Sequence, residues 1–183
     1  MLDSLVDRAR QGDEEAFGTL VRQTGDRCLA IAYRILRDFD QAEDAVQTTL
    51  VAAWRELPNL RDTAKFEAWL HRMLVNSCYA ETKRIRRREA SVQMLVADPK
   101  AGDDYRAIND RDQLERAFAR ISPEQRAVLV FHLYLGLTVP EVADHLGIPL
   151  GTAKSRIHTA TAALRGVLEA DARVPAVRQE RPA

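Results

Sequence analysis

Apolar residues recur every three or four positions along most of the chain, which is the spacing of an amphipathic α-helix. In the N-terminal half this spacing predicts three helices, over about residues 13–36, 40–57 and 63–88. No segment of convincing length alternates apolar and polar residues with the period of two that is typical of a strand. The pattern therefore predicts an all-α protein.

Three further helices are predicted in the last third of the chain, where capping residues mark the helix ends. The segments 122–125 (Ser-Pro-Glu-Gln) and 138–141 (Thr-Val-Pro-Glu) fit the capping box, in which side chains satisfy the free amides of a helix N-terminus. Gly136 and Gly147 are placed to end the first two helices, and Pro149 suits the start of the third. A short middle helix, a tight turn and a longer helix together predict a helix-turn-helix.

In a helix-turn-helix, the second helix enters the DNA major groove and its first residues reach the base edges. The residues at that position are polar or basic: Thr152, Lys154, Ser155, Arg156 and His158. Nucleic-acid binding is therefore the first hypothesis for this segment. Caps and apolar stripes would also suit a three-helix bundle that binds nothing, so that interpretation stays open.

The helical spacing fails between the two sets of helices, which predicts two small helical domains joined by a flexible linker. We expect an N-terminal domain over residues 1–88, a linker over 89–111, a C-terminal helix-turn-helix domain over 112–170 and a loose tail over 171–183. About twenty extended residues reach nearly 70 Å. The two domains could thus contact DNA about two helical turns apart.

Composition narrows the class of protein. The chain has 183 residues, 46% of them hydrophobic, with no long apolar run and no secretory signal at its start, so we expect a cytoplasmic protein that does not insert into a membrane. Cys28 and Cys78 are too few for a disulfide framework or a zinc site and are expected to be reduced, buried thiols. The four histidines lie on separate helical stretches, and no catalytic motif occurs. We therefore expect no enzymatic activity, no metal and no cofactor.

Charge is balanced in total, with 27 basic and 27 acidic residues, but it is unevenly placed. Acids gather at the start of the second helix, where Asp40 is also expected to be the capping residue. Five cations crowd the end of the third helix: Lys83, Arg84, Arg86, Arg87 and Arg88. Contact with phosphates is the favoured interpretation of this basic run, although cations also suit the end of a solvated helix. A neutral chain can therefore offer one face to DNA and another to a protein.

Four sequence blocks, in this order, resemble the extracytoplasmic-function (ECF) sigma factors of bacterial RNA polymerase. They are residues 12–17, residues 40–54, residues 66–70 with Asn76 and the basic run, and residues 136–156. The resemblance covers about residues 12–168. It implies a transcription initiation factor that binds core RNA polymerase and promoter DNA, with two helical domains and without chemistry of its own.

The resemblance also implies a role for each block. In the family, the second helix docks on the polymerase clamp, and the matching residues are Asp40, Glu43, Asp44 and Gln47. The loop before the third helix and that helix capture the melted non-template strand at the minus-ten element, which corresponds to Arg61, Lys65, Asn76 and the basic run. The helix-turn-helix would read the minus-thirty-five element through residues 152–158. Asp40 and Glu43 could equally do no more than cap and solubilise their helix.

Three aromatic residues near these blocks are expected to be structural. Phe66 and Trp69 share helical spacing with Leu70, so core packing is favoured over stacking on bases. Trp54 is likewise expected to pack inside the N-terminal domain.

The chain departs from the family pattern in its last helix, where Thr159, Thr161 and Ala163 stand at positions that often carry arginine. Fewer cations release fewer counterions, so we expect modest affinity for duplex DNA. Family members are commonly held inactive by an anti-sigma factor, which makes one an expected partner, and a sigma factor is expected to be a monomer when free. The alternative is a stand-alone helix-turn-helix regulator that binds symmetric sites as a dimer. That alternative leaves Asn76 and the basic run unexplained.

Overall fold

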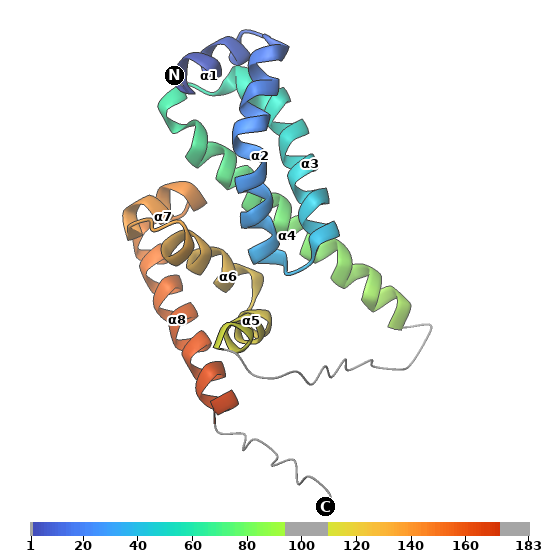
Figure 1. The fold of residues 1–183 in the computed structure, drawn as a ribbon, viewed down its shortest axis with the longest axis vertical. Coiled ribbons are helices and arrows are strands. Elements are labelled where there is room, and N and C mark those ends of the chain that lie inside the picture. Colours follow the sequence, from blue (N-terminus) through green and yellow to red (C-terminus); the bar gives the residue numbers. More distant parts are fainter. Residues whose placement is uncertain (1, 94–109, 173–183) are drawn as a thin grey trace, which may run out of the picture.

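A computed structural model describes residues 2–93 and 110–172 of the chain (Figure 1). Within these ranges the secondary structure is helical and contains no strand, so the predicted all-α class is confirmed. The N-terminal group comprises α1 (Leu2–Arg10), α2 (Glu14–Leu36), α3 (Phe39–Glu56), two 3₁₀ turns, η1 (Leu57–Asn59) and η2 (Thr63–Lys65), and α4 (Phe66–Gln93). The C-terminal group comprises α5 (Asp110–Arg120), α6 (Pro123–Leu129), the π-helical turn η3 (Val130–Tyr134), α7 (Val139–Leu146) and α8 (Leu150–Ala172).

Short polar side chains start the N-terminal helices. Asp13 accepts a hydrogen bond from the backbone amide of Ala16 at 2.9 Å, and Asp38 accepts one from Gln41 at 2.9 Å. Asp38, rather than the predicted Asp40, is therefore the cap of α3, and Asp40 lies in the first turn. The prediction was wrong by two residues because either aspartate precedes the same apolar stripe.

The predicted capping boxes of α6 and α7 are confirmed, whereas Pro149 lies one residue before α8, which begins at Leu150. Gln125 donates its backbone N–H to Ser122 Oγ at 3.2 Å, and its side-chain oxygen accepts from the Ser122 amide at 3.0 Å. Glu141 accepts from the backbone amide of Thr138 at 2.8 Å. Gly147 follows α7 with a φ of 64°, a left-handed conformation that favours glycine, and the short turn after it leads into α8.

Two hydrophobic clusters hold the molecule together. The smaller lies within the C-terminal group and joins Ala117 of α5 and Val128 of α6 to Leu164 of α8. The larger contains the buried faces of α2, α3 and α4, and it also includes Phe131 and Val142 from the C-terminal group. The two groups therefore share one continuous core where α6, η3 and α7 pack on α2 and α4.

The cysteines and the aromatic residues occupy the expected kinds of position, with one exception. Cys28 and Cys78 are buried free thiols, and burial raises their pKa values to about 11 and about 12. Phe66 is buried in the core and Trp69 packs against it, so their predicted structural role is confirmed. Trp54 is only half-buried, because it lies at the edge between α2 and α3.

Helices α1 and α5 were not predicted from the sequence. Helix α4 continues to Gln93, so helix occupies the first residues assigned to the linker, and α5 begins at Asp110. Residues 94–109 of the linker and 173–183 of the tail lie outside the described residues. No helix of the described part is both long enough and apolar enough to cross a membrane.

Candidate nucleic-acid and polymerase interfaces

Helix α4 exposes an amide and a series of cations on the side away from its buried residues Leu70, Leu74 and Cys78. Asn76 is exposed one turn after Arg72 and two turns before Lys83, a spacing that places the three on one helical face. The remaining cations predicted for the minus-ten element are also exposed: Arg61, Lys65, Arg84, Arg86, Arg87 and Arg88. This part of the chain can therefore present an amide between cations to a nucleic acid.

Arg61 and Lys65 are positioned by the short η2 turn that precedes α4. Asp62 caps this turn by accepting a hydrogen bond from the backbone amide of Ala64 at 3.1 Å. Lys65 Nζ lies 3.9 Å from Asp144 Oδ1 of α7. The turn thus brings one predicted DNA-binding cation beside an acid of the C-terminal group.

Arg84 differs from its neighbours in the basic run because it is engaged by two acids. Its Nε lies 3.0 and 2.9 Å from the two carboxylate oxygens of Glu81, and its Nη2 lies 3.2 Å from Asp44 Oδ2 on α3. Hydrogen bonding with Glu81 raises the pKa of Arg84 further, so it stays charged. Its charge is largely compensated, which leaves Lys83, Arg86, Arg87 and Arg88 as the better candidates for phosphate contact.

The predicted polymerase-binding residues form one stripe on α3. Asp40, Glu43, Asp44 and Gln47 are all exposed, and their spacing of three and four residues places them on one face. The opposite face carries the small buried residues Ala42, Ala45, Thr49 and Ala53. The stripe is therefore an exposed polar surface on a helix that packs into the core, and Arg84 of α4 bonds to one of its members, Asp44.

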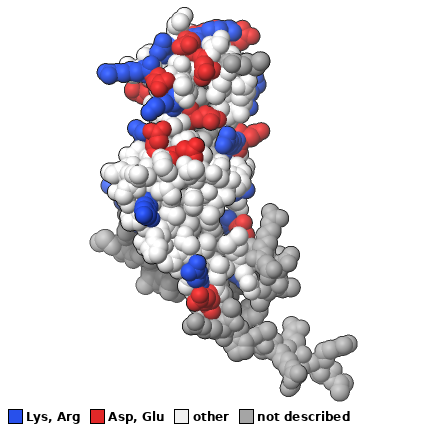
Figure 2. Space-filling model, turned by 90° about the vertical axis from the view of Figure 1, so that its left-hand side faces the viewer, with Lys and Arg blue, Asp and Glu red and all other residues white. Residues whose placement is uncertain are grey.

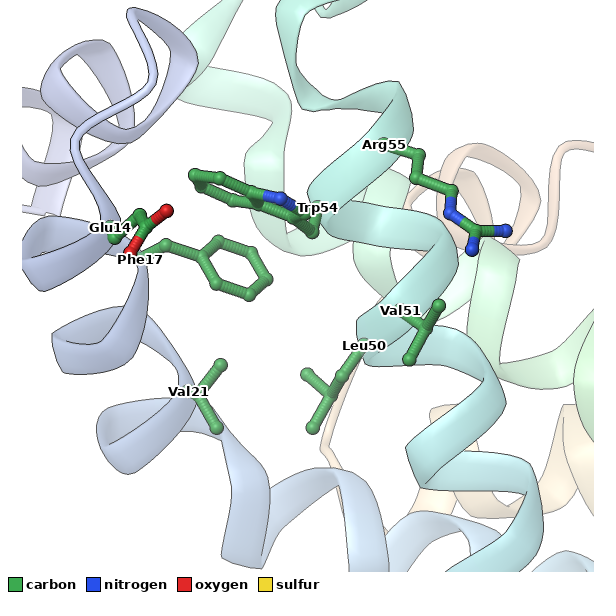
Figure 3. Close-up of a pocket in the computed structure, with 7 residues that line it drawn as sticks. All are labelled: Glu14, Phe17, Val21, Leu50, Val51, Trp54 and Arg55. Atoms are coloured by element: carbon green, nitrogen blue, oxygen red, sulfur yellow. The ribbon is translucent and has the colours of Figure 1, made fainter.

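An apolar groove between α2 and α3 continues this stripe toward the end of α3 (Figure 3). It is lined by Glu14, Phe17, Val21, Leu50, Val51, Trp54 and Arg55. The rings of Phe17 and Trp54 lie 4.9 Å apart between centroids, and Val51 is 53% exposed. Sequence reasoning did not find the groove, because it depends on how two helices pack rather than on one stripe.

The first turns of α8 expose the residues predicted for duplex recognition. Lys154, Ser155, Arg156 and His158 are exposed, and Thr152 is half-buried. The buried Ala153 and Ala160 pack into the C-terminal group, and Arg156, one turn from each, lies at the edge of that buried face. Figure 2 shows the face on which α7 and α8 lie, where charges gather over the N-terminal group and are sparse below it. Among the described residues, few cations on this face are therefore available for duplex phosphates.

Two histidines that the sequence placed on separate helices meet between the two groups. His71 of α4 and His145 of α7 approach with their Nδ1 atoms 2.9 Å apart, and Phe131 of η3 packs edge-on against His71, with ring centroids 5.4 Å apart. Burial, and then the proximity of His145 and Arg27, lowers the pKa of His71 to about 3. Burial also lowers the pKa of His145. Both rings are therefore neutral at pH 7, and one ring must donate its Nδ1–H to the other.

A buried arginine also joins the two helical groups, at the C-terminal end of α2. Arg126 of α6 is 7% exposed and donates to the backbone carbonyl of Ile35 at 2.5 Å. It also donates to the carbonyls of Phe118, Ala119 and Ile121, at 3.1 to 3.3 Å. Backbone carbonyls at the ends of α5 and α2 thus accept the hydrogen bonds of one buried guanidinium. The last carbonyls of a helix are available for this because they have no partner within the helix. Nothing in the sequence pointed to this role, because an arginine after Glu124 and Gln125 is also consistent with an exposed helix face.

Comparisons with known proteins identify both helical groups. Residues 20–89 match the sigma-70 region 2 family, and residues 111–164 match the sigma-70 region 4 family. The chain is 35% identical to ECF RNA polymerase sigma factor SigL of Mycobacterium tuberculosis, over 86% of this chain and 94% of SigL. It is 25% identical to ECF RNA polymerase sigma factor SigW of Bacillus subtilis, over 90% of this chain and 95% of SigW.

Two solved structures are also similar to this chain. CnrH, solved in complex with the cytosolic domain of CnrY, superposes with a TM-score of 0.65 at 27% identity, over 93% of this chain and 98% of CnrH. The sigma factor RpoE of Bartonella quintana, solved with the anti-sigma factor NepR, superposes with a TM-score of 0.64 at 26% identity, over 85% of this chain and 98% of RpoE.

The two matched regions define a promoter-recognition protein of the sigma-70 class. The chain belongs to the ECF sigma factors of that class. It is a DNA-binding transcription initiation factor that works with core RNA polymerase and is not an enzyme. Family membership decides against a stand-alone regulator.

Proposed function

We propose that this sigma factor recognises its promoters through three helical surfaces, one for the melted minus-ten strand, one for the minus-thirty-five duplex and one for core polymerase. The observation that carries the proposal is the exposure of the predicted site residues: sixteen of the seventeen are exposed, and Thr152 is half-buried. They lie on α4 with its preceding turn, on α8 and on α3. Residues 1–88 supply the first and third surfaces, residues 112–170 supply the second, and residues 89–111 link them.

The α4 surface suits a single strand whose bases have left the stack. An unstacked base exposes its hydrogen-bonding edge, and the Asn76 amide can both donate to and accept from that edge. Arg61 and Lys65 before the helix and the basic run after Asn76 are placed to hold the phosphates on either side of that base. The polymerase performs the chemistry, and this surface stabilises the opened strand.

The α8 surface suits duplex DNA in the major groove. Lys154, Ser155 and His158 are exposed within the first turns of the second helix of the helix-turn-helix, where base edges come within reach. Arg156 lies beside Glu124, Gln125 and Thr159 in a shallow hollow between α6 and α8, which suits a contact to the backbone. Sparse cations on this face support a modest, salt-sensitive affinity.

The stripe on α3 and the groove beside it suit a protein partner. Charged residues at the rim and half-buried aromatic residues in a hollow are typical of protein interfaces. We assign this combined surface to core polymerase, with Asp40, Glu43, Asp44 and Gln47 as the polar rim. The same reasoning makes the surface a target for an anti-sigma factor of the kind bound by the RpoE relative.

The free protein is proposed to be a monomer that acts in the cytoplasm, where its polymerase is. A two-part promoter is asymmetric, so recognition does not require a second copy.

Salt dependence tests the role of the basic run. Replacing Arg86, Arg87 and Arg88 together by Ala should weaken promoter complexes of the holoenzyme across sequences and lower the slope of log K against log salt by about 0.7 to 0.9 for each lost contact. The control is Arg22→Ala, which removes an exposed cation of α2 that is not among the predicted DNA-binding residues. An unchanged slope in the triple variant would exclude phosphate contact by the run.

A further inference from the structure

The C-terminal end of α7 lies against the DNA-binding face of α4. Arg72 donates from Nη2 to the backbone carbonyl of Asp144 at 3.0 Å, and Lys65 Nζ lies 3.9 Å from the Asp144 carboxylate. The Arg72 guanidinium also packs so closely on the turn that a Cβ added at Gly147 would lie 2.5 Å from its Nε. Lys65 of η2 and Arg72 of α4 are thus both engaged by one helix end of the C-terminal group.

The chemistry of this helix end resembles that of a nucleic-acid backbone. The last carbonyls of an α-helix carry partial negative charge, and the Asp144 carboxylate adds a full one. Lys65 belongs to the surface proposed to hold the melted strand, and Arg72 lies one turn before Asn76 on the same face. DNA phosphates and the end of α7 would therefore compete for the same two cations.

The histidine pair lies beside this contact and depends on charge. His71 and His145 share a single hydrogen bond between their Nδ1 atoms, which requires one of those nitrogens to be free of a proton. When both rings are protonated, both nitrogens carry hydrogen and two positive charges face each other. Separation of α7 from α4 would expose His71, which is 3% exposed in the packed arrangement.

We propose that the contact between α7 and α4 is an autoinhibitory mask, in which the end of α7 takes the place of DNA on Lys65 and Arg72 and the histidine pair holds it there while the rings are uncharged. The proposal rests on the assignment of the α4 face to DNA. It adds Arg72 to that face, and it requires the two domains to separate before the melted strand can bind.

The pH dependence follows from the charged groups around the pair. Arg27 of α2 lowers the pKa of both rings, whereas Glu67 of α4 and Glu141 and Asp144 of α7 raise that of His145. Burial outweighs these acids, so both values lie below the ordinary pKa of about 6.5. The closed form therefore binds fewer protons than the open form. The histidine contribution to closure is therefore fully present above about pH 6.5 and is lost as the pH falls, by up to tenfold per pH unit for each proton taken up.

Energy transfer between dyes on the two domains of the full-length free chain measures closure. Labels attached at Gln23→Cys on α2 and Ala162→Cys on α8 occupy exposed positions, whereas the native cysteines are at most 1% exposed. Transfer should fall between about pH 7.5 and about pH 5.5 while far-UV circular dichroism stays constant. Constant transfer over this range would overturn the histidine latch.

Asp144→Lys tests the mask at constant pH, because it places a cation where the carboxylate lies beside Lys65, at the helix end whose backbone carbonyl binds Arg72. Transfer should fall, and the free chain should bind a fluorescein-labelled single-stranded oligonucleotide of random sequence about threefold or more tightly, since more of it is competent to bind. The matched control is Glu169→Lys, the same change of charge at an exposed position near the end of α8. Unchanged transfer, or affinity equal to that of the control, would overturn the mask.

A separate variant tests the assignment of the α4 face to DNA, on which the mask rests. In the holoenzyme, where the domains are engaged by polymerase, Lys65→Ala with Arg72→Ala should slow promoter opening. If this double variant opens promoters normally, the assignment of these cations to DNA fails. If it is slow while Asp144→Lys matches its control, the mask alone fails.

Discussion

At the scale of single residues, exposure separates the residues available for recognition from those that build the fold. Asn76 is exposed between the buried Val75 and the half-buried Ser77, and Phe66 lies wholly in the core. The helical spacing of Phe66 and Trp69 was enough to predict their packing. The role of an exposed amide such as Asn76 leaves no such trace in the apolar pattern, and it came from the resemblance to the family.

Asn76→Ala tests the assigned role of this amide in base recognition. Because the side chain is exposed, the free energy of unfolding should change by less than about 0.5 kcal/mol. Transcription by the holoenzyme should lose its preference at one position of the minus-ten element and keep its preferences elsewhere, as measured on templates that vary one base at a time. A large loss of stability in chemical denaturation would instead mark Asn76 as structural.

At the scale of elements, most helices were predictable because an amphipathic stripe and a cap agree. Helix α2 was predicted almost to the residue, and the capping boxes at Ser122 and Thr138 are in place. Helix α1 has only nine residues, too few to show a clear helical period of apolar residues. Helix α5 follows a polar segment, so its apolar stripe was not recognised in the sequence. The start of α3 was misplaced because two aspartates compete for one cap.

The corrected cap gives a matched pair of variants. Asp38→Ala should lower the free energy of unfolding by about 1 kcal/mol, because the Gln41 amide loses its acceptor at 2.9 Å. Asp40→Ala should lower the free energy of unfolding by less, because it removes only a favourable charge in the first turn of α3. Urea denaturation of both variants, read by circular dichroism, would refute the corrected cap if Asp40→Ala were the more damaging change.

At the scale of the whole molecule, the sequence predicted two linked domains, and the structure adds that their cores are continuous. Phe131 and Val142 join the core of the N-terminal group, and Arg126 and His145 bond to residues at least 74 positions away. Contacts between residues so far apart in the sequence cannot be predicted from the local pattern, because each residue also fits the pattern of its own helix. The interdomain contact could therefore be seen only in three dimensions.

The overall account requires an asymmetric promoter read by one chain together with polymerase. We expect the linker within residues 89–111 to let the two domains contact separate parts of one promoter once they move apart. Neither domain is expected to start transcription alone, because the catalytic centre belongs to the polymerase.

Run-off transcription from a library of random promoters tests this claim most directly. Purified core polymerase is used with and without the protein, and the transcripts are sequenced. We expect starts that depend on the protein and are preceded by a shared motif in two parts, near minus ten and minus thirty-five. The absence of such starts, with binding of duplex DNA by the protein alone as a dimer, would contradict the account.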